Sequence, residues 1–393
     1  MKACMLAYTF YESDGRVRRY AEALAKRGDE VEAIVLRQDG QADFEIINGV
    51  NVYRIQRRVR DENGPFSYLA KLLLFFFRSA WVVTKHHLAA RYDLIHVHSV
   101  PDFQVFSTLI PRLMGARVIL DIHDIIPEFY ASKFEVGDRS VVFRFLLLIE
   151  KLSAAYSNHI IIANHLWHAK LTKRSVSPEK CTALINYPDP SLFFCRPRTE
   201  FNNGDFLMCY PGTLNWHQGL DVAINAMAIV RDEAPHVKFL IIGDGPEREK
   251  LKLLVTTQGL EDRVQMSGIR PLECVAKAMA NVNLGVVPKR KNSFGNEAFS
   301  TKIMEFMASG VPVIASDTKI DQHYFPNELV QFCESENPAD LANKILALAH
   351  DPEKQGAMSR RGLDFIRTNN WDVKKIEYLD LVDRLVKGVS VPV

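Results

Sequence analysis

The chain has 393 residues, of which 47% are hydrophobic, and its formal net charge is +2. This length is more than one hydrophobic core usually organises, so we expect about two domains, each able to bury a core of its own. The near balance of 49 basic and 47 acidic residues excludes a protein whose whole surface binds polyanions, and we expect no nucleic-acid partner.

Cysteine use and the amino-terminal sequence bear on the compartment. The six cysteines form no Cys-x-x-Cys pair, which is typical of reduced thiols and not of a zinc site or a disulfide framework. The opening sequence Met-Lys-Ala-Cys-Met-Leu-Ala-Tyr leads directly into a strand-like segment instead of the hydrophobic region of a signal peptide. We therefore expect a cytoplasmic protein.

The first elements in chain order form a β-α-β unit. The pattern predicts a strand over Ala3–Tyr8, a helix over Val17–Lys26 and a strand over Val31–Leu36. The turn before the helix carries Gly15 alone where dinucleotide-binding proteins carry Gly-x-Gly-x-x-Gly, so a hydride-transfer cofactor is not expected. Arg16 follows at the helix start, where it is either exposed to solvent or within reach of a phosphate.

A basic and apolar segment follows. Between residues 54 and 91, eight Lys and Arg residues against two acidic ones give a local charge of +6. Within it, Leu69–Val83 is rich in Leu, Phe and Trp, but its two basic residues leave charge-free runs too short to span a bilayer. Lys71, Arg78 and Lys85 recur at heptad spacing and form one basic stripe along an apolar helix. The stripe is typical of a helix in a membrane interface, and equally of one packed on a sheet with its basic side in water.

Histidines lie at the ends of two predicted strands. The strand Asp93–His98 places His96 and His98 on one face, but the sequence places no third ligand beside them, so we assign no metal. The buried strand Arg117–Ile122 is followed by His123. Because ligands gather at the carboxyl ends of parallel strands, His123 is a candidate for chemistry.

The first domain ends near residue 190. A helix over residues 143–158, a strand over 160–163 and a helix over 165–174 complete a doubly wound pattern. Two prolines in Asn186-Tyr-Pro-Asp-Pro190 and the polar run 196–205 then break the pattern. We therefore predict domains over residues 1–190 and 191–370.

The second domain repeats the alternation of strands and helices. The strand Phe206–Tyr210 leads through a loop containing Gly212 into a helix over Leu220–Val230. The strand Val237–Ile242 ends at Gly243, a turn that lets the backbone approach a ligand closely. Further strands are predicted at 264–268 and 282–287, and further helices at 338–350, 352–369 and 371–387.

The stretch from Asn296 to Ser316 carries the clearest candidate site. Hydrophobic residues at helical spacing predict a short helix that Ser300 caps and that Gly310 ends. Glu297 then lies in the loop before the helix, and Glu305 lies inside it on the face of Thr301. Free N–H groups at the helix start suit a phosphate whose ligand also reaches both carboxylates.

Two glutamates separated by seven residues, followed by Phe-Met-Ala-Ser-Gly-Val-Pro-Val-Ile, resemble the donor-site signature of the retaining glycosyltransferases with the GT-B fold, the large "family four" or group 1 set. The resemblance spans almost the whole chain. It implies an α/β protein of GT-B architecture, with two Rossmann-like doubly wound domains facing across a cleft. Residues 1–190 are then the acceptor-side domain and 191–370 the donor domain, and helix 371–387 packs back on the first domain.

The resemblance also implies roles for single residues. Glu297 and His123 are the catalytic candidates at the donor sugar, and Glu305 accepts hydrogen bonds from the ribose hydroxyls. Other donor-binding candidates lie in the loops and the helix start: Gly212, Thr213, Gly243, Ile269, Arg270, Ala298, Phe299, Ser300, Thr301 and Lys302. Candidate phosphate or loop contacts are Gly15, Arg16, His217 and Gln218, and the membrane or acceptor side carries Lys71, Arg78 and Lys85.

One departure from the pattern concerns the phosphates. Many relatives carry an arginine directly after the first glycine of the loop and a lysine directly before the second, where this chain has Thr213 and Gln218. Either Arg16, Lys302 or His217 then serves the phosphates, or the activity is weakened or lost.

The implied function is hexosyl transfer from a UDP-sugar or GDP-sugar to a glycan or lipid-linked acceptor, such as a polysaccharide precursor, with retention of configuration. The chain has no Asp-x-Asp motif, so we expect neither a metal nor a cofactor. The place would be the cytoplasm, with peripheral attachment to the anionic inner face of the cell membrane. A nucleotide-sugar epimerase of the same fold and a non-catalytic nucleotide-sugar-binding scaffold are the alternatives, which product analysis and donor hydrolysis would separate.

Overall fold

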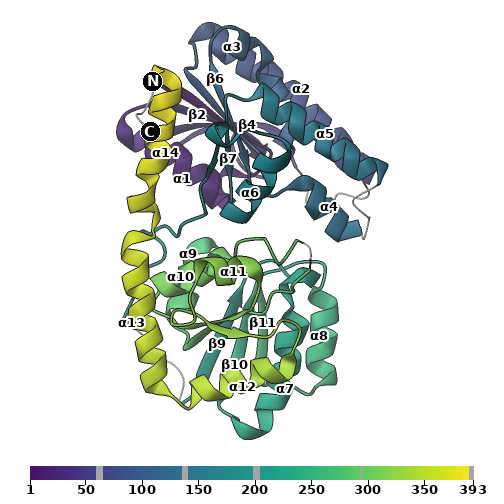
Figure 1. Ribbon diagram of the computed structural model, residues 1–393, viewed down its shortest axis with the longest axis vertical. Coiled ribbons are helices and arrows are strands. Elements are labelled where there is room, and N and C mark those ends of the chain that lie inside the picture. The colour runs from purple at the N-terminus through teal and green to yellow at the C-terminus, as the bar shows by residue number, and fades with distance from the viewer. Residues whose placement is uncertain (59–64, 135–139, 198–203, 293, 389–393) are drawn as a thin grey trace. The chain divides into compact units, whose positions relative to one another are not determined.

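The computed structural model of the protein describes residues 1–58, 65–134, 140–197, 204–292 and 294–388 (Figure 1). The chain folds into two units, Met1–Asn186 with Lys375–Val393 and Tyr187–Lys374. The two units divide after Asn186, whereas the sequence predicted a domain boundary near residue 190. Arg60, Asp61 and Glu62 of the basic segment and residues 198–203 of the polar run lie outside the described residues.

The first unit is built on an eight-stranded sheet with the order β3-β4-β2-β1-β5-β6-β7-β8. Its neighbouring strands are parallel except for β3 and β4. The central strands are covered on both faces, which is why they read as continuous hydrophobic runs. The strands are β1 (Lys2–Ala7), β2 (Glu30–Arg37), β3 (Phe44–Ile47), β4 (Val50–Arg57), β5 (Leu94–His98), β6 (Arg117–Ile122), β7 (His159–Ile162) and β8 (Cys181–Ala183).

Helices connect these strands and cover the sheet. Asp14 caps the first helix by accepting from the N–H groups of Arg16 and Val17, and Gly28 ends it with a φ of 97°. The α-helices are α1 (Gly15–Arg27), α2 (Pro65–Ala89), α3 (Leu109–Leu113), α4 (Ile126–Phe134), α5 (Val141–Tyr156) and α6 (His165–Arg174). Short 3-10 helices are η1 (Tyr11–Ser13), η2 (Asp102–Thr108) and η3 (Pro178–Lys180).

The sequence patterns missed several of these elements. The strand β3 is a four-residue edge strand with an exposed pattern, so it carries no buried periodicity. The helix α3, with five residues, and the strand β8, with three, are also short. Such elements form because their neighbours hold them, and local periodicity does not reveal them.

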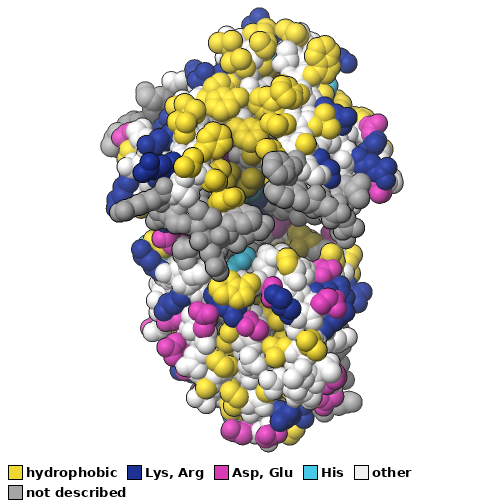
Figure 2. Space-filling model, turned by 90° about the vertical axis from the view of Figure 1, so that its right-hand side faces the viewer, with side chains coloured by type: hydrophobic (Ala, Val, Ile, Leu, Met, Phe, Trp, Pro, Cys, Tyr) yellow, Lys and Arg dark blue, Asp and Glu magenta, His cyan; other side chains and the backbone are white. Residues whose placement is uncertain are grey.

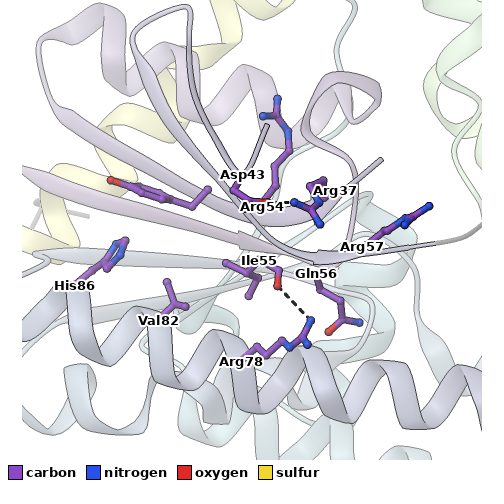
Figure 3. Close-up of a pocket in the computed structure, with 10 residues that line it drawn as sticks. Arg37, Asp43, Arg54, Ile55, Gln56, Arg57, Arg78, Val82 and His86 are labelled. Atoms are coloured by element: carbon purple, nitrogen blue, oxygen red, sulfur yellow. Dashed lines mark hydrogen bonds and ion pairs between the residues drawn. The ribbon is translucent and has the colours of Figure 1, made fainter. Parts of the chain in front are cut away.

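The basic segment contributes less positive surface than its composition predicts. Arg54 lies on β4, is 3% exposed and is paired with Glu12 and Glu45. Figure 3 shows the pocket of about 640 Å³ between β4 and α2, where Arg78 donates to the Ile55 carbonyl at 3.4 Å. Arg54 therefore adds no charge to the outer surface, because its charge is neutralised inside the fold.

Helix α2 packs on the unit through one face only. Leu72, Phe75 and Val83 are buried, whereas Phe77 and Trp81 are 66% and 72% exposed. Figure 2 shows hydrophobic side chains gathered over one face of the first unit. Helix α2 therefore has an apolar face on each side.

The second unit is built on a six-stranded, fully parallel sheet with the order β11-β10-β9-β12-β13-β14. Its core is formed by buried side chains such as Tyr210, Phe239 and Ile314. Together with the first sheet, it confirms the predicted α/β class. The strands are β9 (Phe206–Pro211), β10 (Val237–Ile242), β11 (Val264–Gly268), β12 (Leu284–Val287), β13 (Val313–Ser316) and β14 (Gln331–Cys333).

Helices again connect the strands of the second unit. They are α7 (Leu220–Glu233), α8 (Arg248–Thr257), α9 (Leu272–Ala280), α10 (Thr301–Ala308), α11 (Lys319–Tyr324), α12 (Pro338–Ala349) and α13 (Pro352–Thr368), with the 3-10 helix η4 (Trp216–Gln218). The last helix, α14 (Trp371–Lys387), belongs to the first unit from Lys375 onward. There its Tyr378 side chain is fully buried, and its hydroxyl lies 3.0 Å from His96 Nδ1.

Candidate functional site

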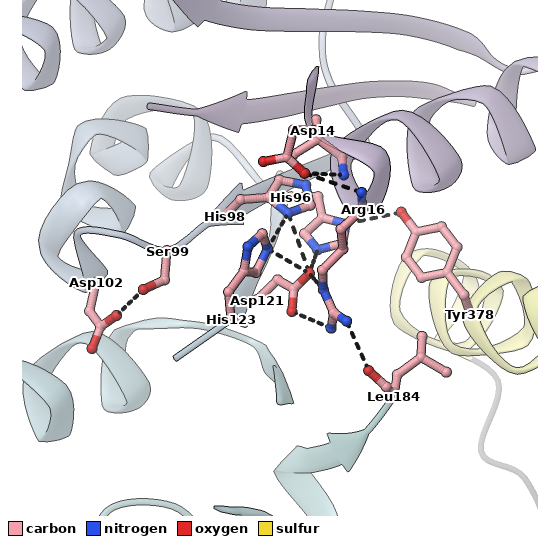
Figure 4. Close-up of polar contacts among 11 residues, drawn as sticks. Asp14, Arg16, His96, His98, Ser99, Asp102, Asp121, His123, Leu184 and Tyr378 are labelled. Carbon is pink, nitrogen blue, oxygen red and sulfur yellow. Dashed lines mark hydrogen bonds and ion pairs between the residues drawn. The ribbon is translucent and has the colours of Figure 1, made fainter. Parts of the chain in front are cut away.

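Asp121, at the carboxyl end of β6, is the centre of a buried polar cluster in the first unit (Figure 4). Arg16 binds both of its carboxylate oxygens, with Nε 2.8 Å from Oδ2 and Nη2 2.7 Å from Oδ1. The third guanidinium nitrogen, Nη1, donates to the Leu184 carbonyl at 3.0 Å. This two-point geometry is the strongest form of an arginine–carboxylate contact.

The charges of this pair stabilise each other inside the fold. Burial by itself would raise the pKa of Asp121, but Arg16 and His123 outweigh it and hold that pKa well below its usual range. Burial by itself would lower the pKa of Arg16, and Asp121 outweighs it in turn. Arg16 is 6% exposed, and its three guanidinium nitrogen atoms donate to Asp121 and to the Leu184 carbonyl of the same unit. We therefore assign Arg16 a structural role and not the phosphate contact that the sequence left open.

Three histidines surround the same carboxylate. The distances to Asp121 Oδ2 are 3.3 Å from His98 Nδ1, 3.4 Å from His123 Nε2 and 3.7 Å from His96 Nε2. His98 Nδ1 also lies 3.1 Å from His123 Nε2, so the two rings share a contact. His123 has the most open side chain of the three, with 23% exposed, whereas His98 is 2% and His96 0% exposed. The geometry makes His98 and Asp121 the supports that orient His123.

His96, His98 and Asp121 are also a metal-type group, because their ligand atoms lie within 4.8 Å of one another. The guanidinium of Arg16 already occupies both oxygens of Asp121. A metal ion would have to share that carboxylate with a fixed positive charge, which Coulomb repulsion opposes. The contacts therefore favour a histidine cluster organised by an arginine–aspartate pair.

In the second unit, two glycine turns meet where β9 and β10 end. Gly212 and Gly243 have φ angles of 144° and 143°, a region that other residues rarely adopt. A Cβ atom on Gly243 would lie 1.9 Å from the Gly212 carbonyl oxygen, and one on Gly212 would lie 2.5 Å from Lys302 Cε. Both positions therefore favour glycine: Gly243 because of its φ and the Gly212 backbone, and Gly212 because of its φ, with the end of the Lys302 side chain packed against it.

Lys302 is the cation that the structure brings to this loop. It is the second residue of α10, and its Nζ lies 5.2 Å from the centre of the Tyr210 ring. The Tyr210 hydroxyl donates to the Thr213 carbonyl at 3.1 Å, so ring, loop and lysine form one arrangement. Burial lowers the pKa of Lys302, and neighbouring Glu305 opposes that shift. Lys302 thus lies against Gly212, the residue directly before Thr213, where the resembled pattern carries an arginine.

His217 does not supply a second positive charge. Burial, together with Lys302 and Lys289, lowers the pKa of His217 to about 4, so the ring is neutral at pH 7. The adjacent Gln218 ends the turn η4, which Gly219 follows with a φ of 66°. Of the three residues proposed to replace the missing cations, Lys302 alone is a cation placed on this loop.

A buried lysine supports the loop that precedes α10. Lys289 Nζ donates to the Ala298 carbonyl at 2.5 Å and to Ser300 Oγ at 3.0 Å, and lies 3.0 Å from Asp321 Oδ2. Ser300 holds the N-cap position of α10 but makes no side-chain cap, because its hydroxyl is bound to Lys289 and donates to Asp321 at 3.3 Å. The predicted Ser300 cap is therefore wrong, since tertiary partners take the oxygen.

The remaining candidate residues lie in the loop before α10, on α10 itself and in the loop after β11. Phe299 packs against Tyr324 with ring centres 4.9 Å apart and so anchors the loop. The half-buried residues around it in the loop and on α10 are Glu297, Ala298, Thr301 and Glu305. Ile269 and Arg270 are exposed in the loop after β11.

Comparisons with known proteins identify the family. "Glycosyl transferase 4-like domain" matches residues 15–186, and "Glycosyl transferases group 1" matches residues 194–364. Sucrose-phosphate synthase from Thermosynechococcus elongatus has a similar fold, with a TM-score of 0.80, 20% identity and coverage of 99% of this chain and 100% of that one. The chain belongs to the group 1 glycosyltransferases of the GT-B fold.

Two further similarities describe this glycosyltransferase. The structure of HepE from Anabaena in complex with UDP and glucose is similar at a TM-score of 0.73 and 18% identity, with coverage of 98% of this chain and 100% of that one. The gpi3 subunit of phosphatidylinositol N-acetylglucosaminyltransferase from Schizosaccharomyces pombe is 24% identical over 262 residues, which are 66% of this chain and 54% of that protein. The match thus spans about half the length of that relative.

Sequence reasoning did not identify the residues that hold this glycosyltransferase's candidate site together. Asp121 and Lys289 organise the two units' polar clusters, and Tyr378 reaches His96 from a distant helix. Their signal in the sequence is weak: an Asp at a buried strand end and a Lys two residues after β12. Partners far apart in the chain give each of them its role.

The buried histidines predict a pH-dependent stability. Burial and neighbouring His96 lower the pKa of His98 to about 3, whereas an unfolded histidine titrates near about 6.5. Between these values the unfolded chain binds a proton that the folded chain does not, so stability falls as the pH falls, by about 1.4 kcal/mol per pH unit. In His98→Asn, which removes this titration, thermal unfolding measured from pH 7 to pH 5 should vary less with pH than in the wild type.

The exposed His350 offers a matched control, because His350→Asn makes the same substitution at a histidine that is not buried. It should leave the wild-type pH dependence in place. Equal pH dependence in His98→Asn and the wild type would contradict the buried neutral state of His98.

Proposed function

We propose that this glycosyltransferase moves a sugar from a nucleotide-diphosphate sugar to a glycan or lipid-linked acceptor, with retention of configuration and without a metal. The observation that carries the proposal is the position of Lys302, on the Gly212 turn at the start of α10. This position of Lys302 brings a positive charge to the free N–H groups at the helix start. In the sequence, Lys302 lies between Glu297 and Glu305. HepE, a similar structure, binds UDP and glucose, which supports a nucleotide-sugar donor.

The donor's parts have separate contacts in this proposal. The diphosphate lies at Lys302 and the first turn of α10, with the backbone of the Gly212 and Gly243 turns close by. Glu305 accepts hydrogen bonds from the ribose hydroxyls, since a carboxylate is an acceptor for two hydroxyl donors. Glu297 and His123 act on the donor sugar.

The proposed chemistry keeps the anomeric configuration. The bond between the anomeric carbon and the diphosphate oxygen breaks, and its electron pair leaves with the diphosphate. The acceptor hydroxyl attacks from the same face, and a departing phosphate oxygen takes its proton. The protein then needs no separate base, but it must stabilise an oxocarbenium-like sugar and the growing charge on the diphosphate.

The proposed setting is the cytoplasmic side of a membrane. The gpi3 relative is named as a phosphatidylinositol N-acetylglucosaminyltransferase subunit, which supports a lipid-linked acceptor. In this chain, Lys71, Arg78 and Lys85 recur along α2 beside its exposed apolar face. An anionic inner membrane surface is a fitting partner for this combination.

Replacement of Lys302 by glutamine should weaken nucleotide-diphosphate binding by about 10- to 100-fold, since a hydrogen bond to a charged group contributes about 1.5 to 3 kcal/mol. Calorimetric titration with UDP and GDP measures this change. Lys252→Gln, on the outer face of α8, should bind like the wild type. Wild-type affinity in Lys302→Gln would show that the phosphates bind elsewhere.

Replacement of Glu305 by glutamine should weaken donor binding by a similar factor, because the neutral amide is a poorer acceptor for the ribose hydroxyls. Thermal-shift titration with a panel of nucleotide-sugars measures the change and identifies the base and sugar. Glu249→Gln, with an 81% exposed side chain, is the matched control. Excess EDTA should leave binding unchanged, and loss of binding with EDTA would reject the metal-free site.

Replacement of Glu297 by glutamine should lower kcat more than donor affinity, because the lost interaction is strongest in the transition state. His123→Ala should act in the same direction but more mildly. Steady-state kinetics with the identified donor and acceptor, and NMR of the product's anomeric configuration, test both. An inverted product would reject retention, and donor binding without any turnover in the wild type would favour the scaffold alternative.

A further inference from the structure

Three helices of the first unit expose large apolar side chains on one face. Helix α2 packs on α3 and on η2, and α5 packs on η2 as well. Figure 2 shows the hydrophobic side chains gathered over this part of the unit. Those exposed by at least 42% are Leu69, Leu73, Leu74, Phe77, Trp81 and Leu88 of α2, Leu109, Ile110 and Leu113 of α3, and Val141, Val142, Phe145, Leu148 and Leu152 of α5.

The charges on these helices have one sign. The three helices carry six Lys and Arg residues, namely Lys71, Arg78, Lys85, Arg112, Arg144 and Lys151, and a single acidic residue, Glu150. Glu150 is 1% exposed, and Arg174 binds both of its oxygens, at 2.9 and 2.5 Å. Within the three described helices, the face therefore combines exposed apolar side chains with positive charge and no exposed carboxylate.

The packing of α2 decides how such a face can meet a bilayer. By length and composition Ser67–Ala89 could cross a membrane, with a mean hydropathy of 1.3. However, Leu72, Phe75 and Val83 are buried in the unit, and Gln56 Nε2 donates to the Lys71 carbonyl at 3.0 Å. A spanning helix would have to leave those partners, whereas a helix lying flat keeps them and inserts only its outer side.

We propose that α2, α3 and α5 together form a platform that docks flat on an anionic bilayer and inserts its apolar side chains into the interface. This inference rests on the membrane setting of the proposed function and extends it from one helix to three. A bilayer matches the platform because it offers acyl chains to Phe77, Trp81 and Phe145 and anionic headgroups to the flanking cations. A protein partner or a second copy would need acidic groups against these cations, and the platform itself presents none.

Trp81 provides a direct reporter of insertion, because its side chain is 72% exposed on the platform. Trp167 and Trp371 are buried, so Trp216→Phe removes the other exposed tryptophan, which lies in the second unit. The purified full chain carrying this change is titrated with phosphatidylcholine vesicles with and without phosphatidylglycerol, and with brominated acyl chains as quenchers. We expect a blue shift and bromine quenching of Trp81 on the anionic vesicles.

Two variants separate the three-helix platform from α2 acting alone. Leu113→Ser with Phe145→Ser changes only α3 and α5, at side chains that are 72% and 58% exposed, and should weaken vesicle binding at least tenfold. Lys71, Arg78 and Lys85→Gln should weaken it at low salt and little at high salt. Leu253→Ser, at a 68% exposed apolar side chain of the second unit, is the control and should not change binding.

Binding that is unaffected by Leu113→Ser with Phe145→Ser would overturn the platform, as would the absence of Trp81 quenching. A dimer in sedimentation that these changes dissociate would overturn it in favour of a second copy. Donor binding is measured in parallel, in the same variants and in the chain whose platform is unchanged. In the chain with the unchanged platform, donor binding without vesicle binding rejects the platform alone, whereas vesicle binding without donor binding rejects the proposed function alone.

Discussion

The buried pair of Arg16 and Asp121 is the interaction on which the first unit's polar centre depends. It joins the start of α1 to the end of β6, and through the Leu184 carbonyl to the segment after β8. An unpaired charge at either position would carry a large desolvation cost, so each residue requires the other. With its negative charge fixed in this way, Asp121 can hold His98 and His123 within 3.4 Å. Within this cluster, His123 is the histidine that reaches solvent, and the buried residues Asp121 and His98 orient it.

In the second unit, a backbone constraint and two lysines organise the loops around the start of α10. The turns at Gly212 and Gly243 approach each other so closely that no side chain fits between them. Lys302 fills the remaining space from above, and Lys289 holds the preceding loop through Ala298 and Ser300. Lys289 is bound to Asp321, whereas Lys302 is the lysine that we propose as the ligand of the donor phosphates. This division explains how a chain with Thr213 and Gln218 in place of two cations keeps a positive charge at the helix start.

The apolar outer face of the first unit is the feature that catalysis does not explain. A sheet-covering helix normally keeps polar side chains in water, but α2 is apolar on both sides and its neighbours α3 and α5 are apolar outside as well. An acceptor that is itself embedded in a membrane would give this face a purpose. In our proposal, the donor binds at the helix start of the second unit, and the surface of the first unit places the enzyme on the membrane.

The sequence by itself determined the α/β class, the strands and helices with strong periodicity, and the family signature around Glu297 and Glu305, because these depend on local patterns. It also indicated the face shared by His96 and His98, which follows from strand alternation. Only the tertiary structure decided what the polar residues do. Arg16 became a structural partner, Arg54 was neutralised inside, Ser300 lost its cap and Lys302 reached Gly212, because each role depends on an atom supplied by a distant part of the chain.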